Sequence, residues 1–259
     1  MLRFFSALIL TSFAALAMAE PPAATDAPTT ATVTATPTVN KWAKLYNDRV
    51  DLFMLENSRL PVGRKNLVFV GDSITQGFDL PKYFPGYPVL NRGIGSDGIT
   101  TIPGGPSTRG VTNRLGPSIL DTNPAIVFIL IGTNDIGQAT VPLDYWFDAY
   151  ERIITVTMAQ LPATKIVIQL PPPTGLAFAR HLKWNPRKDD FNKRLRQLAT
   201  KHKLEIVDLD SMFRDQEGLL RADLTGDGLH LRAEAYKMWA AAVMPILQRA
   251  GIKPEPVAP

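Results

Sequence analysis

The chain of 259 residues contains no cysteine, which limits both how it can be stabilised and how it can react. Disulfide bonds, lipid anchors on cysteine and cysteine nucleophiles are all excluded. After the first 19 residues, no apolar run is long enough to cross a bilayer, so we expect no stable membrane insertion. Only three histidines are present, which leaves few candidates for a catalytic base.

A strong excess of charge is also missing. The formal net charge is +4, and basic residues are interleaved with acidic ones except in the denser stretch 180–203, which we interpret as a solvated helix face. This distribution does not favour a nucleic-acid partner. Residues 223–228 lack the alternating acids of a calcium loop, and the proline- and glycine-rich stretch after 93–98 cannot open the helix that a dinucleotide site requires. We therefore expect neither a metal nor a cofactor.

Composition divides the chain into three parts. Residues 1–19 combine Arg3, an apolar stretch and the small-x-small pattern Ala17-Met18-Ala19, which is typical of a signal peptide cleaved before Glu20. Residues 20–40 are an Ala/Thr/Pro linker that is expected to be disordered, and residues 41–259 form one domain. The prediction is an exported protein, periplasmic or secreted.

Strand-like and helix-like patterns alternate along the domain. Helical periodicity is expected before Pro61, over 146–161, around 191–198 and over 233–249, and buried strands over 66–70, 88–91, 125–131, 165–170 and 204–209. Strands separated by helices form a parallel sheet covered on both faces. The predicted fold is therefore α/β, a three-layer αβα sandwich around a five-stranded parallel sheet, with chemistry at the carboxyl ends of its strands.

A serine lies at the first of these strand ends, in Gly71-Asp72-Ser73-Ile74-Thr75. A buried strand, a tight turn and a helix start would present the Ser73 hydroxyl at the edge of the sheet, with helix-start amides beside it. This arrangement predicts a nucleophile. Gly-Asp-Ser also occurs in ordinary turns, so the prediction depends on a base and an oxyanion donor elsewhere.

The best base is His230, because Asp227 precedes it by three residues in a turn and can hold the ring Nδ1–H. His202 is expected on a helix face among lysines, and His181 in a loop. Asn134 ends the third strand and could donate its side-chain N–H to an oxyanion, although an Asn-Asp turn or helix cap is the better explanation of the residue taken alone.

Taken together and in this order, the Gly-Asp-Ser turn, the glycine loop 91–98, Gly132-Thr-Asn-Asp135 and Asp-x-x-His resemble the SGNH (GDSL) hydrolase superfamily. The loop is similar to that of the platelet-activating-factor acetylhydrolase-like branch. The resemblance implies the flavodoxin-like fold of that family, Ser73 as nucleophile, Asp227 and His230 as acid and base, and an oxyanion hole made by Ser73, Ser96 and Asn134. Ser96 departs from the family's usual glycine, so Gly95 remains the alternative donor.

These residues predict a serine esterase that acts through a covalent acyl-enzyme. The resemblance to the acetylhydrolase-like branch, together with export, favours short-chain esters, first of all O-acetyl groups on carbohydrate. The expected partner is a small-molecule or polysaccharide ester. Alternatives are a lysophospholipase or thioesterase on longer acyl chains, an O-acetyltransferase, or a non-catalytic carbohydrate-binding protein. The sequence does not predict an oligomeric state or identify substrate-binding residues.

Overall fold

The computed structural model describes residues 41–103 and 109–255. The predicted signal peptide (1–19) and linker (20–40) lie outside the described residues, and so do residues 256–259 of the predicted domain. Within the described ranges, no helix combines the length and the apolar character needed to cross a membrane.

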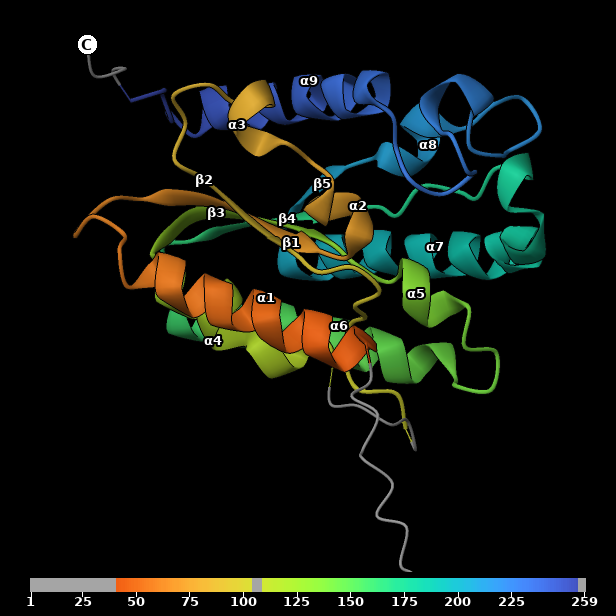
Figure 1. Ribbon diagram of the computed structural model, residues 1–259, viewed down its shortest axis with the longest axis horizontal. Coiled ribbons are helices and arrows are strands. Elements are labelled where there is room, and N and C mark those ends of the chain that lie inside the picture. The colour runs from red at the N-terminus through yellow and green to blue at the C-terminus, as the bar shows by residue number, and fades with distance from the viewer. Residues whose placement is uncertain (1–40, 104–108, 256–259) are drawn as a thin grey trace, which may run out of the picture. The chain divides into compact units, whose positions relative to one another are not determined.

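A single parallel sheet carries the domain (Figure 1). Its order is β2-β1-β3-β4-β5, which confirms the predicted five-stranded parallel sheet. The strands are β1 (Asn66–Gly71), β2 (Val89–Gly93), β3 (Pro124–Leu130), β4 (Lys165–Gln169) and β5 (Glu205–Val207). Chain order reverses at β1, whose neighbours β2 and β3 lie on opposite sides, and such a switch point opens a crevice at the carboxyl edge.

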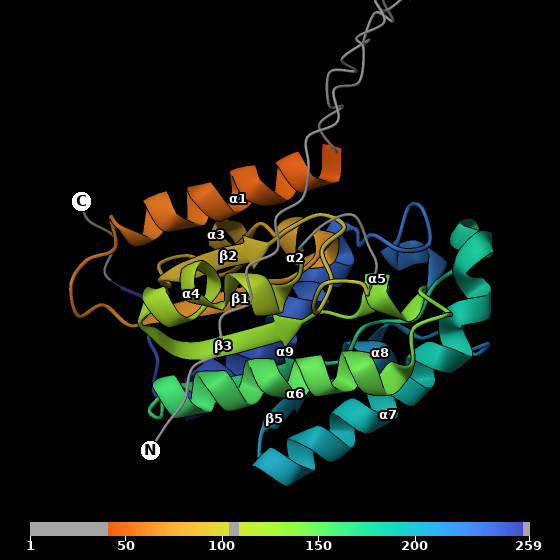
Figure 2. The ribbon, with the colours of Figure 1, turned by 90° about the horizontal axis from the view of Figure 1, so that it is seen from below.

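Helices cover both faces of the sheet, which confirms the three-layer αβα sandwich (Figures 1 and 2). One face carries α3 (Leu80–Tyr83), α8 (Leu209–Phe213) and α9 (Ala233–Arg249). The other carries α1 (Lys41–Asn57), α4 (Leu115–Ser118), α6 (Leu143–Gln160) and α7 (Asn185–His202).

Alternate strand residues fill the two layers of core. Phe69 and Phe128 stack with ring centroids 4.6 Å apart and belong to the core that includes Trp239 of α9. Val68, on the opposite face of β1, belongs to the core that includes Trp146 of α6. Burial on both faces explains why these strands are almost continuously apolar in sequence.

Short one-turn elements connect the sheet to the site. The helices α2 (Ser73–Gln76) and α5 (Thr133–Ile136) follow β1 and β3, and the 3₁₀ helices are η1 (Val111–Arg114), η2 (Leu120–Thr122), η3 (Leu176–Trp184) and η4 (Ala222–Leu224). The strand predicted over 204–209 is shorter than expected, because Asp208 caps α8 by accepting a hydrogen bond from the Ser211 amide at 3.0 Å.

Candidate active site

The turn after β1 presents Ser73 as the first residue of α2. Asp72 caps this helix, since its Oδ1 accepts a hydrogen bond from the Ile74 amide at 2.9 Å. Gly71 lies opposite both Gly93 and Leu130 in the sheet register, so the ends of β2, β1 and β3 meet at one edge. A Cβ at Gly71 would collide with the Thr75 side chain and the Leu130 carbonyl, which explains why glycine ends the strand.

A hydrogen-bonded chain links Ser73 to a turn 157 residues further along the sequence. The Ser73 Oγ lies 3.0 Å from Nε2 of His230, and Nδ1 of His230 lies 2.7 Å from Oδ2 of Asp227. Because a carboxylate only accepts hydrogen bonds, Nδ1 carries the proton in this contact, which leaves the Nε2 lone pair facing the serine hydroxyl. This geometry allows His230 to accept the Ser73 proton.

The 225–230 turn is braced by its own backbone. The second oxygen of Asp227 accepts hydrogen bonds from the amides of Leu229 and His230, at 2.9 and 2.8 Å. Thr225 joins the two ends of the turn, because its hydroxyl donates to the His230 carbonyl and accepts from the Gly228 amide. Gly228 has a φ of 84° and packs against the start of η3. The sequence analysis did not identify Thr225, although a threonine two residues before an aspartate is a recognisable turn signal.

Partial burial alone would raise the pKa of Asp227. Hydrogen bonds from the His230 ring and from the amides of His230 and Leu229 outweigh it, and lower this pKa to about 2. The side chains of His230 and Asp227 are 49 % and 50 % exposed, so the turn faces solvent.

Three hydrogen-bond donors lie on the segments that follow the neighbouring ends of β1, β2 and β3. The amides of Ser73 and Ser96 have no acceptor among the described residues, and neither does one of the two amide hydrogens of Asn134, whose other donates to the Asp97 carbonyl at 2.8 Å. The Gly95 amide, by contrast, donates to the Gln76 side chain at 2.6 Å. Of the two alternatives left open by the sequence, Ser96 therefore retains the available amide.

Ser96 adopts a left-handed backbone conformation with a φ of 60°. This region favours glycine, because a Cβ crowds the following carbonyl. Serine therefore occupies this position at a cost in backbone strain that glycine would avoid.

Buried carboxyl groups lie behind this edge of the sheet. Burial raises the pKa of Asp135 to about 8 despite a hydrogen bond from the Ile99 amide. Burial likewise raises the pKa of Asp72 to about 6, although the Ile74 amide opposes the shift. The carboxyl groups of Asp72 and Asp135 are therefore in a much less polar environment than that of Asp227.

The structure brings all the sequence-predicted site residues to one edge of the sheet: Ser73, Ser96, Asn134, Asp227 and His230. The other histidines do not join them. His181 stacks on Phe178, with ring centroids 4.2 Å apart, and Nε2 of His202 lies 2.6 Å from Glu151. In the described ranges, no group of acidic or histidine side chains could hold a metal ion.

A pocket of about 490 Å³ lies elsewhere, between α1, the start of α3 and strand β2. None of Ser73, Ser96, Asn134, Asp227 and His230 lines it, so its volume says nothing about the acyl group that the site would accept.

Comparison with known proteins agrees with this geometry. The family model of the GDSL-like lipase/acylhydrolase family matches residues 69–238. No match is found among curated protein sequences.

Several solved structures share the fold. A Streptococcus pneumonia protein, provisionally described as a platelet activating factor, is 24 % identical with a TM-score of 0.69, over 80 % of this chain and 94 % of the other. A provisionally described acylhydrolase from Bacteroides fragilis is also 24 % identical (TM-score 0.67, 81 % and 98 %). A variant of an acetylxylan esterase from Geobacillus stearothermophilus is 18 % identical (TM-score 0.54, 77 % and 100 %).

Proposed function

This chain belongs to the GDSL-like lipase/acylhydrolase family and is a carboxylic ester hydrolase, and we propose that it removes acetyl groups from carbohydrate esters through a covalent acyl-enzyme. The observation that carries the proposal is the chain of contacts from Ser73 through His230 to Asp227, at 3.0 and 2.7 Å, beside three available N–H donors.

In the first half of the reaction, the Ser73 Oγ attacks the ester carbonyl while Nε2 of His230 takes its proton. Asp227 holds the ring by the contact at Nδ1 and balances the charge of the imidazolium. The negative charge that develops on the carbonyl oxygen is bound by the amides of Ser73 and Ser96 and by the Asn134 side chain. His230 then gives its proton to the departing alcohol.

In the second half, water takes the place of the alcohol. His230 removes a proton from the water as it attacks the acetyl-Ser73 carbonyl, and the same three donors bind the second oxyanion. Collapse of this intermediate breaks the bond to Ser73, which recovers its proton from His230, and acetate leaves.

Two observations support a carbohydrate ester as substrate. The side chains of Asp227 and His230 are half exposed, which suits an ester that is part of a polymer chain. The fold is also shared with an acetylxylan esterase, which is an analogy of fold and not of substrate contacts.

The test is hydrolysis of p-nitrophenyl esters of increasing acyl length, beside acetylated xylo-oligosaccharides, with Ser73→Ala as the control. The proposal expects the highest kcat/KM on acetyl esters, release of acetate from the oligosaccharides and no turnover by the variant. A preference for octanoyl or longer chains would instead indicate a lipase or thioesterase, and acetyl transfer to an added sugar in preference to water would indicate an acetyltransferase.

We also propose that the protein is exported, on the pattern of residues 1–19 alone. N-terminal sequencing of the protein recovered from the medium or periplasm is expected to begin at Glu20. Protein that retains Met1 in the cytoplasm would contradict this proposal.

A further inference from the structure

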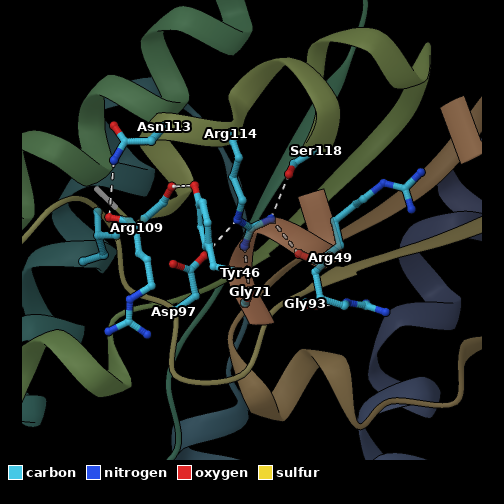
Figure 3. A network of polar contacts seen from close by, with 12 residues as sticks. Tyr46, Arg49, Gly71, Gly93, Asp97, Arg109, Asn113, Arg114 and Ser118 are labelled. Carbon is cyan, nitrogen blue, oxygen red and sulfur yellow. Dashed lines mark hydrogen bonds and ion pairs between the residues drawn. The ribbon is translucent and has the colours of Figure 1, made fainter. Parts of the chain in front are cut away.

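A wholly buried arginine contacts Gly71 and Asp97, which lie next to the segments that carry the candidate oxyanion amides (Figure 3). The side chain of Arg114, at the end of η1, is 0 % exposed and makes four hydrogen bonds. Its Nε donates to Asp97 Oδ2, and one terminal nitrogen donates to the Arg92 carbonyl and the Ser118 hydroxyl, all at 2.8 Å. The other terminal nitrogen donates to the Gly71 carbonyl at 3.0 Å. We call Arg114 and these four partners the Arg114 cluster.

One arm of the cluster reaches the turn that carries the nucleophile. The Gly71 carbonyl accepts hydrogen bonds from both Arg114 and the Ile94 amide, at 3.0 and 3.1 Å. This carbonyl belongs to the peptide immediately before the one that contains the Ser73 N–H. Two donors on the same oxygen therefore restrict the rotation of the backbone that aims the Ser73 amide.

Another arm reaches the loop that carries the second amide. Asp97 directly follows Ser96, and its side chain is 0 % exposed. Its carboxylate accepts from Arg114, its carbonyl accepts from Asn134, and its amide donates to Ile94. Asp97 therefore connects the Ser96 amide to the Asn134 side chain, and Arg114 connects both to the Ser73 turn.

Arginine suits this position because its guanidinium is a rigid plane with five N–H donors. Its four hydrogen bonds reach four segments: the end of β1 at Gly71, the end of β2 at Arg92, the loop at Asp97 and helix α4 at Ser118 (Figure 3). The single flexible ammonium of lysine could keep the charge beside Asp97, but it could not hold all of these segments at fixed spacing.

From this geometry we propose that Arg114 is a positioning residue, which fixes the Ser73 and Ser96 amides at the spacing that the oxyanion of the reaction requires. The inference rests on the proposed function, because that function assigns the two amides to the oxyanion. Arg114 touches no reacting atom and acts through Gly71 and Asp97.

Arg92 provides a matched control. It is also 0 % exposed, but its guanidinium donates to the side chains of Glu56 and Asn57 on α1. Loss of either arginine is expected to destabilise the fold, because each leaves a carboxylate or amide partner unpaired. Only Arg114 is bonded to the two segments that carry the amides.

The experiment compares Arg114→Lys, the double variant Arg114→Met/Asp97→Asn and Arg92→Met, well below every melting transition. The double variant leaves no unpaired buried charge from the pair and so protects the fold. For both Arg114 variants, kcat on p-nitrophenyl acetate is expected to fall about 10–100-fold, the scale of a misplacement near 1 Å, with KM within about threefold. Inhibition by a short alkyl boronic acid, whose tetrahedral adduct occupies the oxyanion hole, should weaken in proportion to kcat/KM. Arg92→Met should change kcat less than about threefold.

Equal kcat in the wild type, Arg114→Lys and the double variant would overturn the inference, as would an equal loss in Arg92→Met. If the double variant does not fold, Arg114→Lys decides the matter, because it keeps the buried charge. Ser73→Ala distinguishes a failure of the proposed function from a failure of this inference. Full turnover by Ser73→Ala would overturn both. An inactive Ser73→Ala beside fully active Arg114 variants would overturn only the role of Arg114.

Discussion

Two hydrogen-bonded pairs of side chains, with nearly equal contact distances, serve the two sides of this site, and they differ in almost everything else. His230 and Asp227 are 2.7 Å apart on a half-exposed turn, whereas Arg114 and Asp97 are 2.8 Å apart with no exposed surface. An exposed pair contributes about 0–1 kcal/mol to stability, and removing one partner of a buried pair costs about 3–5 kcal/mol. The first pair can therefore exchange protons at little structural cost, whereas the second can hold backbone in place and cannot lose one partner alone without a cost in stability.

The same contrast governs the carboxyl groups. On the exposed turn, hydrogen bonds and the facing histidine outweigh partial burial and lower the pKa of Asp227 to about 2. Behind the sheet edge, burial raises the pKa of Asp135 to about 8. The exposed turn favours the charged form of Asp227, whereas burial favours the neutral form of Asp135, so substitutions of these two residues should separate activity from stability.

The largest expected effect is on activity alone. His230→Ala should lower kcat on p-nitrophenyl acetate by at least about 10⁴-fold, because the serine loses its base. The melting temperature should stay within about 4 °C of the wild type, since the lost pair is exposed. His202→Ala is the control. It removes a histidine that contacts Glu151 outside the site, and it should keep kcat. An inactive His202→Ala beside an active His230→Ala would reverse the assignment.

Asn134→Ala tests a residue that belongs to both regions. Loss of one oxyanion donor should lower kcat by about 10²–10³-fold, and loss of the bond to the Asp97 carbonyl should cost about 1 kcal/mol of stability. Asn192→Ala is the matched control, because it removes a buried asparagine that donates to the Pro171 carbonyl in the same way. It should lower stability without lowering kcat, measured by steady-state kinetics and thermal unfolding. Similar kcat values for the two variants would remove Asn134 from the oxyanion hole.

How far the sequence predicted this arrangement depends on how local each feature is. The last helix was expected over 233–249 and has those bounds, and the strand expected over 125–131 is Pro124–Leu130, because long periodic or apolar runs determine such elements locally. The order of the strands depends on packing between distant segments, and the residue patterns alone did not predict it. Of the one-turn helices, only the one that begins at Ser73 was expected.

Within the site, the sequence predicted which residues would react, but it did not predict the hydrogen bonds that hold the surrounding backbone in place. Gly-Asp-Ser and Asp-x-x-His indicated Ser73, Asp227 and His230 from short motifs. The engagement of the Gly95 amide by Gln76 joins residues 19 apart, and the Arg114–Gly71 contact joins residues 43 apart. No local pattern encodes these contacts, so the left-handed conformation of Ser96 and the individual partners of Arg114 emerge only from the structure.

A pH experiment addresses the contrast between the carboxyl groups. The pKa of Asp135 is higher in the fold than its ordinary value of 3.8, so its contribution to stability is full below about pH 4 and is lost as the pH rises through about 8. Asp135→Asn removes this loss, and should therefore raise the melting temperature relative to the wild type more at about pH 8 than at about pH 5.

Asp227→Asn is the control for that experiment. The pKa of Asp227 is lowered, so its contribution is present above about pH 4 and is lost only as the pH falls through about 2. Its substitution should change the melting temperature by the same small amount at both pH values. A difference between Asp135→Asn and the wild type that does not depend on pH would show that the Asp135 carboxyl is not held neutral.

The smallest effect concerns strain in the oxyanion loop. Ser96→Gly should stabilise the protein by about 0.5–1 kcal/mol, because glycine adopts a φ of 60° without the crowding of a Cβ. It keeps the backbone N–H, so kcat should change less than about threefold. Lys203→Gly, at another left-handed position with a φ of 54°, should give a similar gain in thermal unfolding with no change in kcat. A tenfold or larger loss of kcat in Ser96→Gly alone would show that the serine side chain itself takes part.

The central claim is that Ser73 becomes acylated during turnover, and one measurement addresses it directly. The protein is mixed with p-nitrophenyl acetate, quenched in acid within the first turnover, digested and analysed by mass spectrometry. The account predicts one acetyl group on Ser73, absent from unreacted protein and from Ser73→Ala treated in the same way. Turnover with the acetyl group on another residue would contradict it. So would turnover with no acetyl group on Ser73 at any quench time, if Ser73→Ala released p-nitrophenol as fast as the wild type.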